Sequence, residues 1–181
     1  MTIGLKKIYT LIKMRLINSD VTISVNKTNV REHDRDFYIP LNSNYTLDIN
    51  NKSDKTIDYR VSIDGTHVGT WRIYPKSSVS LERPVDKPYK FCFVDKDTIP
   101  ELRNKKDTGV LVISEWVCKD PIEDLIWYEA GALETDGPCG ATILADKSSQ
   151  TFSHCPKLET TRIGEYTIGM KPSTAAPYML L

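Results

Sequence analysis

The residues best suited to chemistry in this chain are its four cysteines and three histidines. A cysteine thiolate is a nucleophile and a metal ligand. A thiol beside an imidazole would therefore indicate a thiol enzyme, and a cluster of both would indicate a zinc site. The cysteines are far apart, however, with no C-x-x-C pair, and no two histidines stand at ligand spacing. Spacing alone therefore predicts neither kind of site.

The four cysteines fall into two groups by their surroundings. Cys92 lies inside an aromatic run and Cys118 ends an apolar one, which favours buried thiols of low reactivity. Cys139 and Cys155 lie in expected loops, where a disulfide or a zinc site that includes His154 stays open as an alternative.

No local motif indicates catalytic residues. The sequence contains no GxSxG, P-loop, GxGxxG or HExxH pattern. His154 and Cys155 are neighbours, and neighbours on an extended chain point to opposite sides. A thiol–imidazole pair would therefore have to join Cys155 to His67 or His33. We predict that the protein is not an enzyme and uses no cofactor or metal.

The three tryptophans could form a platform for a ligand, since their rings offer flat apolar faces. Each of them lies within a run of apolar residues, however, which favours a place in the hydrophobic core. We therefore expect Trp71, Trp116 and Trp127 to be core residues.

Charge and hydropathy narrow the class of protein. Lys plus Arg equals Asp plus Glu at 24 each, which argues against a nucleic-acid partner, because such binders carry a basic excess. Residues 1–20 are basic and amphipathic, and predict an arm that contacts a membrane surface or a neighbouring subunit. The chain shows no signal-peptide pattern and no apolar run of about 18 residues, so we expect a reducing compartment.

The elements that must position these residues are strands. Residues 57–64 alternate strictly between apolar and polar types, which is typical of a strand with one buried face. Asp64 and Gly65 then favour a tight turn of a hairpin. Gly69, where the apolar phase changes, predicts a bulge in the returning strand. Further strands are expected at 21–26, 37–41, 45–50, 66–73, 79–81, 89–93, 109–117, 141–145, 150–152 and 166–170.

The number of strands and turns decides the fold class. Residues 120–123 (DPIE) are typical of a helix start, so one short helix is predicted near 121–130. Residues 171–181 are rich in Pro and small residues and predict a flexible C-terminal tail. The rest predicts an all-β protein, an antiparallel β-sandwich over residues 21–170.

Three motifs give the chain a wider resemblance: Ile63-Asp64-Gly65, VGTWR at 68–72 and LERP at 81–84. Their order, together with YKFCFV, the Gly-led GVLVISEWV and the later strands, covers about residues 36–170. It resembles small virion proteins of large double-stranded DNA viruses of protists and algae, of the penton-like or minor capsid kind. The resemblance implies a single jelly roll.

The resemblance also implies a function. It indicates a structural virion component of capsid or vertex type, assembled in the host cytoplasm, whose partners are other capsid subunits or copies of itself. Net neutrality would let many copies pack without strong repulsion. One alternative is a non-enzymatic β-sandwich module that binds a peptide or a carbohydrate through loops near His67 and 135–140. Another is an enzyme that uses Cys155 or clustered acids.

Overall fold

The strands of this protein form two facing layers, shown by a computed structural model that describes residues 18–119, 128–129 and 140–173. Among these residues the only helical segments are two 3-10 turns, η1 (Lys96–Thr98) and η2 (Pro100–Leu102). The strands are β1 (Ser19–Val25), β2 (Thr28–Asn29), β3 (Arg31–His33), β4 (Asp36–Ile39), β5 (Ser43–Asn44), β6 (Thr46–Asn51), β7 (Ile57–Ile63), β8 (Thr66–Ile73), β9 (Ser78–Leu81), β10 (Tyr89–Asp95), β11 (Val110–Cys118), β12 (Tyr128–Glu129), β13 (Gly140–Lys147) and β14 (Thr160–Pro172). The all-β sandwich expected from the sequence is confirmed.

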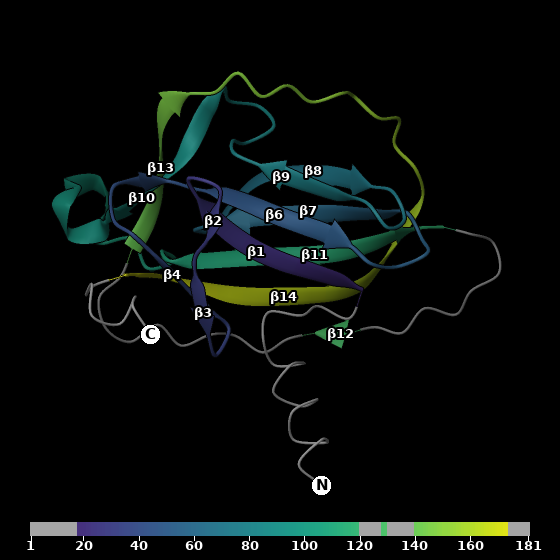
Figure 1. Ribbon diagram of the computed structural model, residues 1–181, viewed down its shortest axis with the longest axis horizontal. Coiled ribbons are helices and arrows are strands. Elements are labelled where there is room, and N and C mark those ends of the chain that lie inside the picture. The colour runs from purple at the N-terminus through teal and green to yellow at the C-terminus, as the bar shows by residue number, and fades with distance from the viewer. Residues whose placement is uncertain (1–17, 120–127, 130–139, 174–181) are drawn as a thin grey trace, which may run out of the picture.

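One layer contains the sheet β2-β1-β6-β9, and the short sheet β13-β10-β5 adjoins it because β5 leads directly into β6 (Figure 1). The other layer is the long sheet β3-β4-β14-β11-β7-β8. Most neighbouring strands are antiparallel. The exceptions are β14 with β4 and β14 with β12, which are parallel. The second layer is therefore mixed, and the expectation of a purely antiparallel sandwich does not hold at these two pairs.

The strict alternation of β7 sets the face that each side chain occupies. Ile57, Tyr59, Val61 and Ile63 are buried, and the residues between them lie on the outer face. β7 pairs with β8 on one side and with β11 on the other. The pairing register therefore determines which side chains of β8 and β11 face the core and which lie on the outer face.

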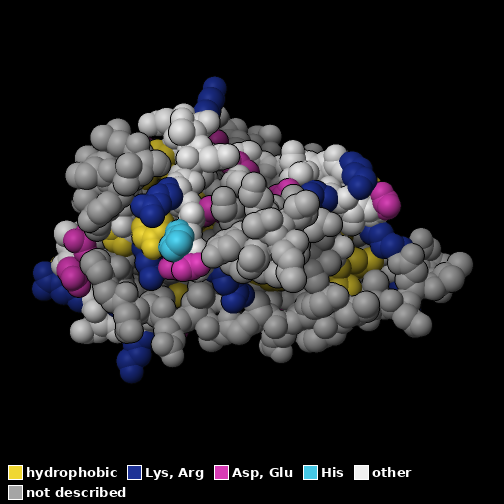
Figure 2. Space-filling model, turned by 60° about the horizontal axis from the view of Figure 1, so that its bottom comes forward, with side chains coloured by type: hydrophobic (Ala, Val, Ile, Leu, Met, Phe, Trp, Pro, Cys, Tyr) yellow, Lys and Arg dark blue, Asp and Glu magenta, His cyan; other side chains and the backbone are white. Residues whose placement is uncertain are grey.

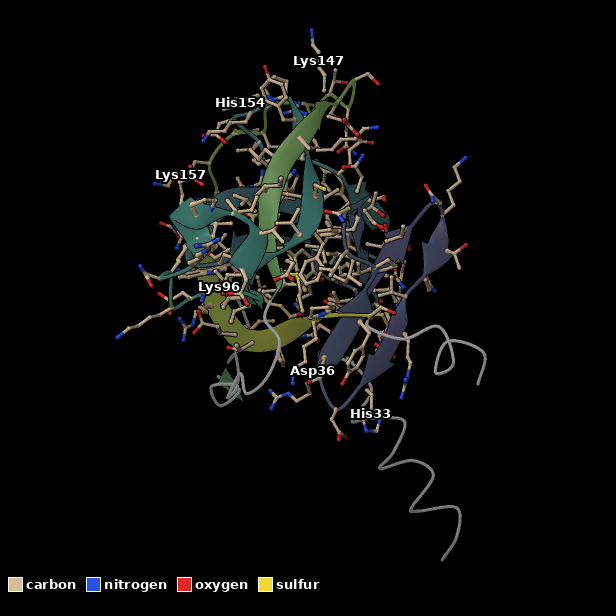
Figure 3. The ribbon with its side chains drawn as sticks, turned by 90° about the vertical axis from the view of Figure 1, so that its left-hand side faces the viewer. His33, Asp36, Lys96, Lys147, His154 and Lys157 are labelled. Atoms are coloured by element: carbon tan, nitrogen blue, oxygen red, sulfur yellow. The ribbon has the colours of Figure 1, made fainter. Side chains whose placement is uncertain are left out.

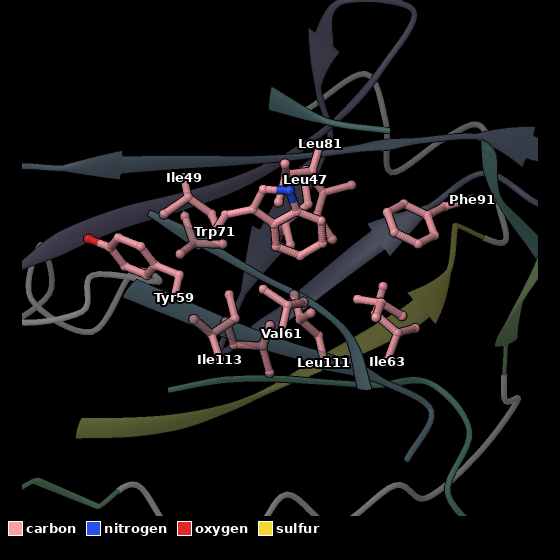
Figure 4. Packing of buried hydrophobic residues seen from close by; sticks show 14 of the residues in the cluster. Leu47, Ile49, Tyr59, Val61, Ile63, Trp71, Leu81, Phe91, Leu111 and Ile113 are labelled. Carbon is pink, nitrogen blue, oxygen red and sulfur yellow. The ribbon is translucent and has the colours of Figure 1, made fainter. Parts of the chain in front are cut away.

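The core lies between the two layers (Figure 4). The Trp71 ring sits among Leu47, Leu81 and Val61 from both layers. Full burial of one such apolar side chain stabilises the fold by roughly 1.5–3 kcal/mol, so this cluster is the main stabilising contribution. The largest fully buried side chains are Tyr45, Tyr59, Phe37, Phe91, Phe93, Ile23, Ile39, Leu47, Ile49, Ile57, Leu81 and Leu111.

The hairpin between β7 and β8 turns at Asp64 and Gly65, whose φ angles are 51° and 78°. Two consecutive positive φ values are what a primed two-residue turn requires. The pairing of β7 with β8 shifts register between Val61 and Ser62, opposite Gly69. Gly69 thus lies at a bulge, where a Cβ atom would stand 2.6 Å from the Trp71 ring.

The predicted helix near 121–130 is wrong in the part that the structure describes. Tyr128–Glu129 is a strand, β12, which pairs with Gly164 and Glu165 of β14, and the remaining residues of the predicted helix lie outside the described ones. A capping pattern at 120–123 could not reveal this, because strand pairing depends on a partner far along the chain.

The sandwich extends slightly past its predicted bounds of 21 and 170, since β1 begins at Ser19 and β14 ends at Pro172. The predicted N-terminal arm, apart from residues 18–20, lies outside the described residues, and so do residues 174–181 of the predicted tail.

Candidate functional site

A segment without regular secondary structure, residues 148–159, crosses from the end of β13 to the start of β14 and is here called the strap (Figure 1). Gln150 ties its first half to the chain around β9. The Glu82 amide donates to Gln150 Oε1 (2.9 Å), Gln150 Nε2 donates to the Ser80 carbonyl (2.6 Å), and Arg83 Nε donates to the Gln150 carbonyl (2.8 Å). Ser148 Oγ also donates to Glu82 Oε2 at 2.6 Å. The LERP motif therefore anchors the strap.

Phe152 of the strap covers the edge of the core. The Phe152 ring meets the Trp71 ring edge-on, with 5.6 Å between the two ring centroids. The Arg83 guanidinium lies 4.4 Å from the centroid of the Phe152 ring. Trp71 is 7% exposed, as its expected place in the core requires. A strap pinned by an aromatic contact of this kind holds its position over the sheet edge.

Beyond Phe152 the strap and the outer face of the β7–β8–β11 sheet enclose a groove of about 790 Å³. Residues 153–158 form one wall, and Asp58, Arg60 and Trp116 lie on the sheet side. A groove of this size is within the range of ligand pockets. We call it the strap groove.

Trp116 lies in the strap groove and not in the core, so its expected role was wrong. It is half-buried, its Nε1 donates to Ser114 Oγ (2.9 Å), and the Arg60 guanidinium lies 5.4 Å from its ring centroid. Counting by two along β11 explains this. Leu111 and Ile113 are buried on one face, while Trp116 is in phase with Ser114 on the other. The long apolar run concealed that phase.

Asp58 and Arg72 form a bidentate ion pair across β7 and β8, with distances of 2.9 and 3.0 Å. The Asp58 hydrogen bonds raise the pKa of Arg72 further above its ordinary value. Arg72 also donates to the Pro156 carbonyl at 2.8 Å, which fixes the second half of the strap. This pair neutralises the only carboxylate that lines the groove within the described residues.

Two cations of the groove, Arg60 and Lys157, have no such neutralising partner in the part of the chain that the structure describes. Among the described residues, no carboxylate pairs with Arg60 or Lys157. His154 adds an imidazole to the same wall, and Figure 3 shows it on the strap together with Lys157. The groove therefore carries a local positive charge in a protein of zero formal net charge.

Exposed apolar side chains gather at the rim of the groove. Four large hydrophobic side chains of the described residues are markedly exposed, and three of them line the groove: Tyr74 (60%), Val85 (47%) and Leu158 (45%). The fourth, Tyr89, lies elsewhere. Exposed apolar clusters bordered by polar residues mark binding surfaces in soluble proteins.

The cysteines occupy three different environments. Cys92 is buried and Cys118 is half-buried, and burial raises the pKa of both thiols, which makes them poorer nucleophiles. Cys155 is exposed on the strap, and Cys139 lies outside the described residues, so the predicted disulfide or zinc alternative is untested.

Of the two histidines considered as partners of Cys155, His33 lies far from the part of the strap that carries Cys155. His33 stands at the opposite end of the molecule from His154 in Figure 3. His67 is near Thr70, with 3.3 Å between Nε2 and Oγ1.

No group of three or more His, Cys, Asp or Glu side chains within the described residues is placed to hold a metal ion. None of the helical turns described is long and apolar enough to cross a membrane.

Glu115 is a buried acid that the sequence analysis did not identify. It is fully buried, and Ser19 Oγ donates to its Oε2 at 2.6 Å while the Ser19 and Tyr59 hydroxyls bond to each other. Burial raises the pKa of Glu115 to about 7, although hydrogen bonds from Ser19 and Tyr166 oppose the shift. The signal in the sequence was its spacing, because Glu115 stands two residues after the buried Ile113 on the same strand and so faces inward too.

Asp64 is a second buried acid, and it does more than form a turn. Its Oδ1 accepts from the amides of Gly109 (2.8 Å) and Val110 (3.2 Å), and its Oδ2 accepts from the Thr142 amide (2.8 Å). The hairpin tip is thereby joined to β11 and β13. Burial raises the Asp64 pKa against these hydrogen bonds, and the role is structural.

Comparison with protein-family models, with curated proteins and with solved structures finds no match to this chain. The functional interpretation therefore depends on the chemistry of the strap groove and on the resemblance carried by the sequence motifs. The groove is the one feature of the described residues where exposed apolar side chains, unpaired cations and a cavity coincide.

Proposed function

We propose that this protein is a structural component of a virion, a single jelly-roll subunit of capsid or vertex type that acts through protein–protein interfaces. The observation that carries the proposal is the gathering of Tyr74, Val85 and Leu158 around the strap groove. Exposure of several apolar side chains to water is unfavourable in free energy, and a partner that covers them removes this cost. The groove is thus a surface suited to a neighbouring protein.

The remaining surface supports the same role. Among the described residues in view in Figure 2, acidic and basic side chains are interspersed. On the described residues, pairs such as Lys171 with Asp36 (3.1 Å) neutralise charge locally. Copies of a protein with such a surface and no net charge can pack closely without long-range repulsion.

A second candidate is a β-sandwich module that binds a free peptide or carbohydrate. The strap groove favours it, since Trp116 and Tyr74 place aromatic side chains in a cavity of suitable size. The site would then lie at the strap and not at the loops near His67 and 135–140 that the sequence indicated; residues 135–139 lie outside the described ones. A carbohydrate ligand would need a free aromatic face, and the Arg60 guanidinium lies over one face of Trp116.

Sedimentation velocity over a range of concentrations tests the proposed function. We expect concentration-dependent association that is weakened by Tyr74→Ser, because this change removes an apolar side chain from the groove rim. Tyr89→Ser is the matched control, since Tyr89 is also exposed (45%) but does not line the groove. A chain that stays monomeric at all concentrations and is absent from purified particles would contradict the proposal.

A further inference from the structure

We propose that the strap groove binds an extended acidic segment of a neighbouring protein, one in which carboxylates alternate with aromatic or aliphatic side chains. The inference deepens the proposed function by naming the chemistry of the partner, and it rests on that function in taking the groove as a protein interface. The groove offers such a segment three things: cations, apolar contacts and backbone groups.

The charges of the groove select an anion. Asp58, the one carboxylate in the described lining, is held by Arg72 through two hydrogen bonds, so it is already neutralised. Arg60 and Lys157 remain without a carboxylate partner among the described residues. Two cations on facing walls of a groove attract carboxylates and disfavour a basic segment, because like charges would then be brought together.

The apolar rim selects a segment that also carries hydrophobic side chains. Tyr74 and Val85 lie at the sheet side of the groove and Leu158 on the strap. In an extended peptide every second side chain points the same way, so one face can carry carboxylates while the other carries apolar groups. A peptide of this kind satisfies both the cations and the exposed apolar rim.

The strap offers a backbone against which an extended chain can hydrogen-bond. Residues 153–158 are exposed, and among the described contacts only the Pro156 carbonyl accepts a hydrogen bond, from Arg72. Backbone amides and carbonyls without an intramolecular partner are groups to which a bound peptide can hydrogen-bond, and they provide affinity without dependence on sequence.

Fluorescence anisotropy with labelled peptides tests this inference. The probe is a fluorescein-labelled decapeptide in which glutamates alternate with leucines and tyrosines, and its partner probe has every glutamate replaced by lysine. We expect saturable binding of the acidic probe, at least about tenfold tighter than that of the basic probe and weakened by added salt.

Charge-reversal variants locate the binding. Arg60→Glu on the sheet and Lys157→Glu on the strap should each weaken binding of the acidic probe by about tenfold or more. Lys147→Glu is the matched control, an exposed lysine on β13 that does not line the groove, and should change the affinity by less than about twofold. Because both groove residues are exposed, the variants should fold, and a circular dichroism melt of each one checks this.

Several results would overturn the inference. Two concern the peptides: the acidic probe shows no saturable binding, or the basic probe binds equally well. Two others concern location and specificity: Lys147→Glu weakens binding of the acidic probe as much as the groove variants do, or a single-stranded oligonucleotide of the same charge binds as tightly as the acidic probe. If the probe fails to bind while Tyr74→Ser still weakens association and Tyr89→Ser does not, the acidic partner is wrong and the proposed function stands. If none of these surfaces matters to association, the proposed function fails as well.

Discussion

Ionisation of Glu115 should make the stability of this protein fall as the pH rises through neutrality. The side chain is fully buried between the layers, and burial raises its pKa from 4.5 to about 7. A carboxyl with a higher pKa in the folded state than in the unfolded state binds more protons when folded. Its contribution to stability is therefore fully present below pH 4.5 and is lost as the pH rises through about 7.

The size of this effect follows from the pKa difference. Each unit of pKa corresponds to about 1.4 kcal/mol, so a rise from 4.5 to about 7 corresponds to a loss of roughly 3 kcal/mol between the two limits. Glu115→Gln removes the ionisation and keeps an oxygen that can accept from Ser19. The variant should come closest to the wild type in stability near pH 4.5 and exceed it at about pH 8.

Urea unfolding at about pH 4.5, 6, 7 and 8, a series that covers the interval from 4.5 to about 7 in which the contribution is lost, measures this difference. Asp64, whose pKa burial also raises, contributes the same pH dependence to both proteins and cancels in the comparison. Glu101→Gln is the matched control, because Glu101 is exposed on η2 and should leave the pH dependence unchanged. If the free energy of unfolding changed with pH in the same way for the wild type and Glu115→Gln, the reasoning would be refuted.

Three further substitutions test the contacts that hold the fold and the strap. Asp64→Asn should lower the free energy of unfolding by about 1–3 kcal/mol in urea, since an amide cannot accept from all three backbone donors; an unchanged midpoint would contradict its joining role. Gly69→Ala should cost about 1–3 kcal/mol by thermal unfolding, because the added Cβ would stand 2.6 Å from the Trp71 ring; a stability gain would show that the bulge relaxes freely. Phe152→Ala should cost about 2 kcal/mol and speed proteolysis of the strap; an unchanged cleavage rate would mean that Phe152 does not hold it.

The sequence predicted the local features of this fold well where one strand and its own pattern decide the outcome. The alternation in residues 57–63 and the positive φ at Asp64 and Gly65 depend on neighbours along the chain, and they appear where expected. The same alternation in β11 would have placed Trp116 outside and Glu115 inside. Trp116 was expected in the core because its neighbours along the chain are apolar, and the run gave no separate expectation for Glu115.

The candidate site could not be predicted because it is built by contacts between distant segments. The strap lies against β8 and β9 through Gln150, Phe152 and Pro156, which stand about 70 to 84 residues from their partners. No local motif encodes such contacts, and the expected strand at 150–152 is part of the strap. The parallel pairing of β12 with β14 is nonlocal in the same way.

The most direct test of the proposed function is quantitative mass spectrometry of particles purified from cells that express this chain from its native genome. The proposal that the protein is a structural virion component predicts that its peptides copurify with the particles at a constant ratio to the other shell proteins. Its absence from particles in which the other shell proteins are complete would contradict the proposal.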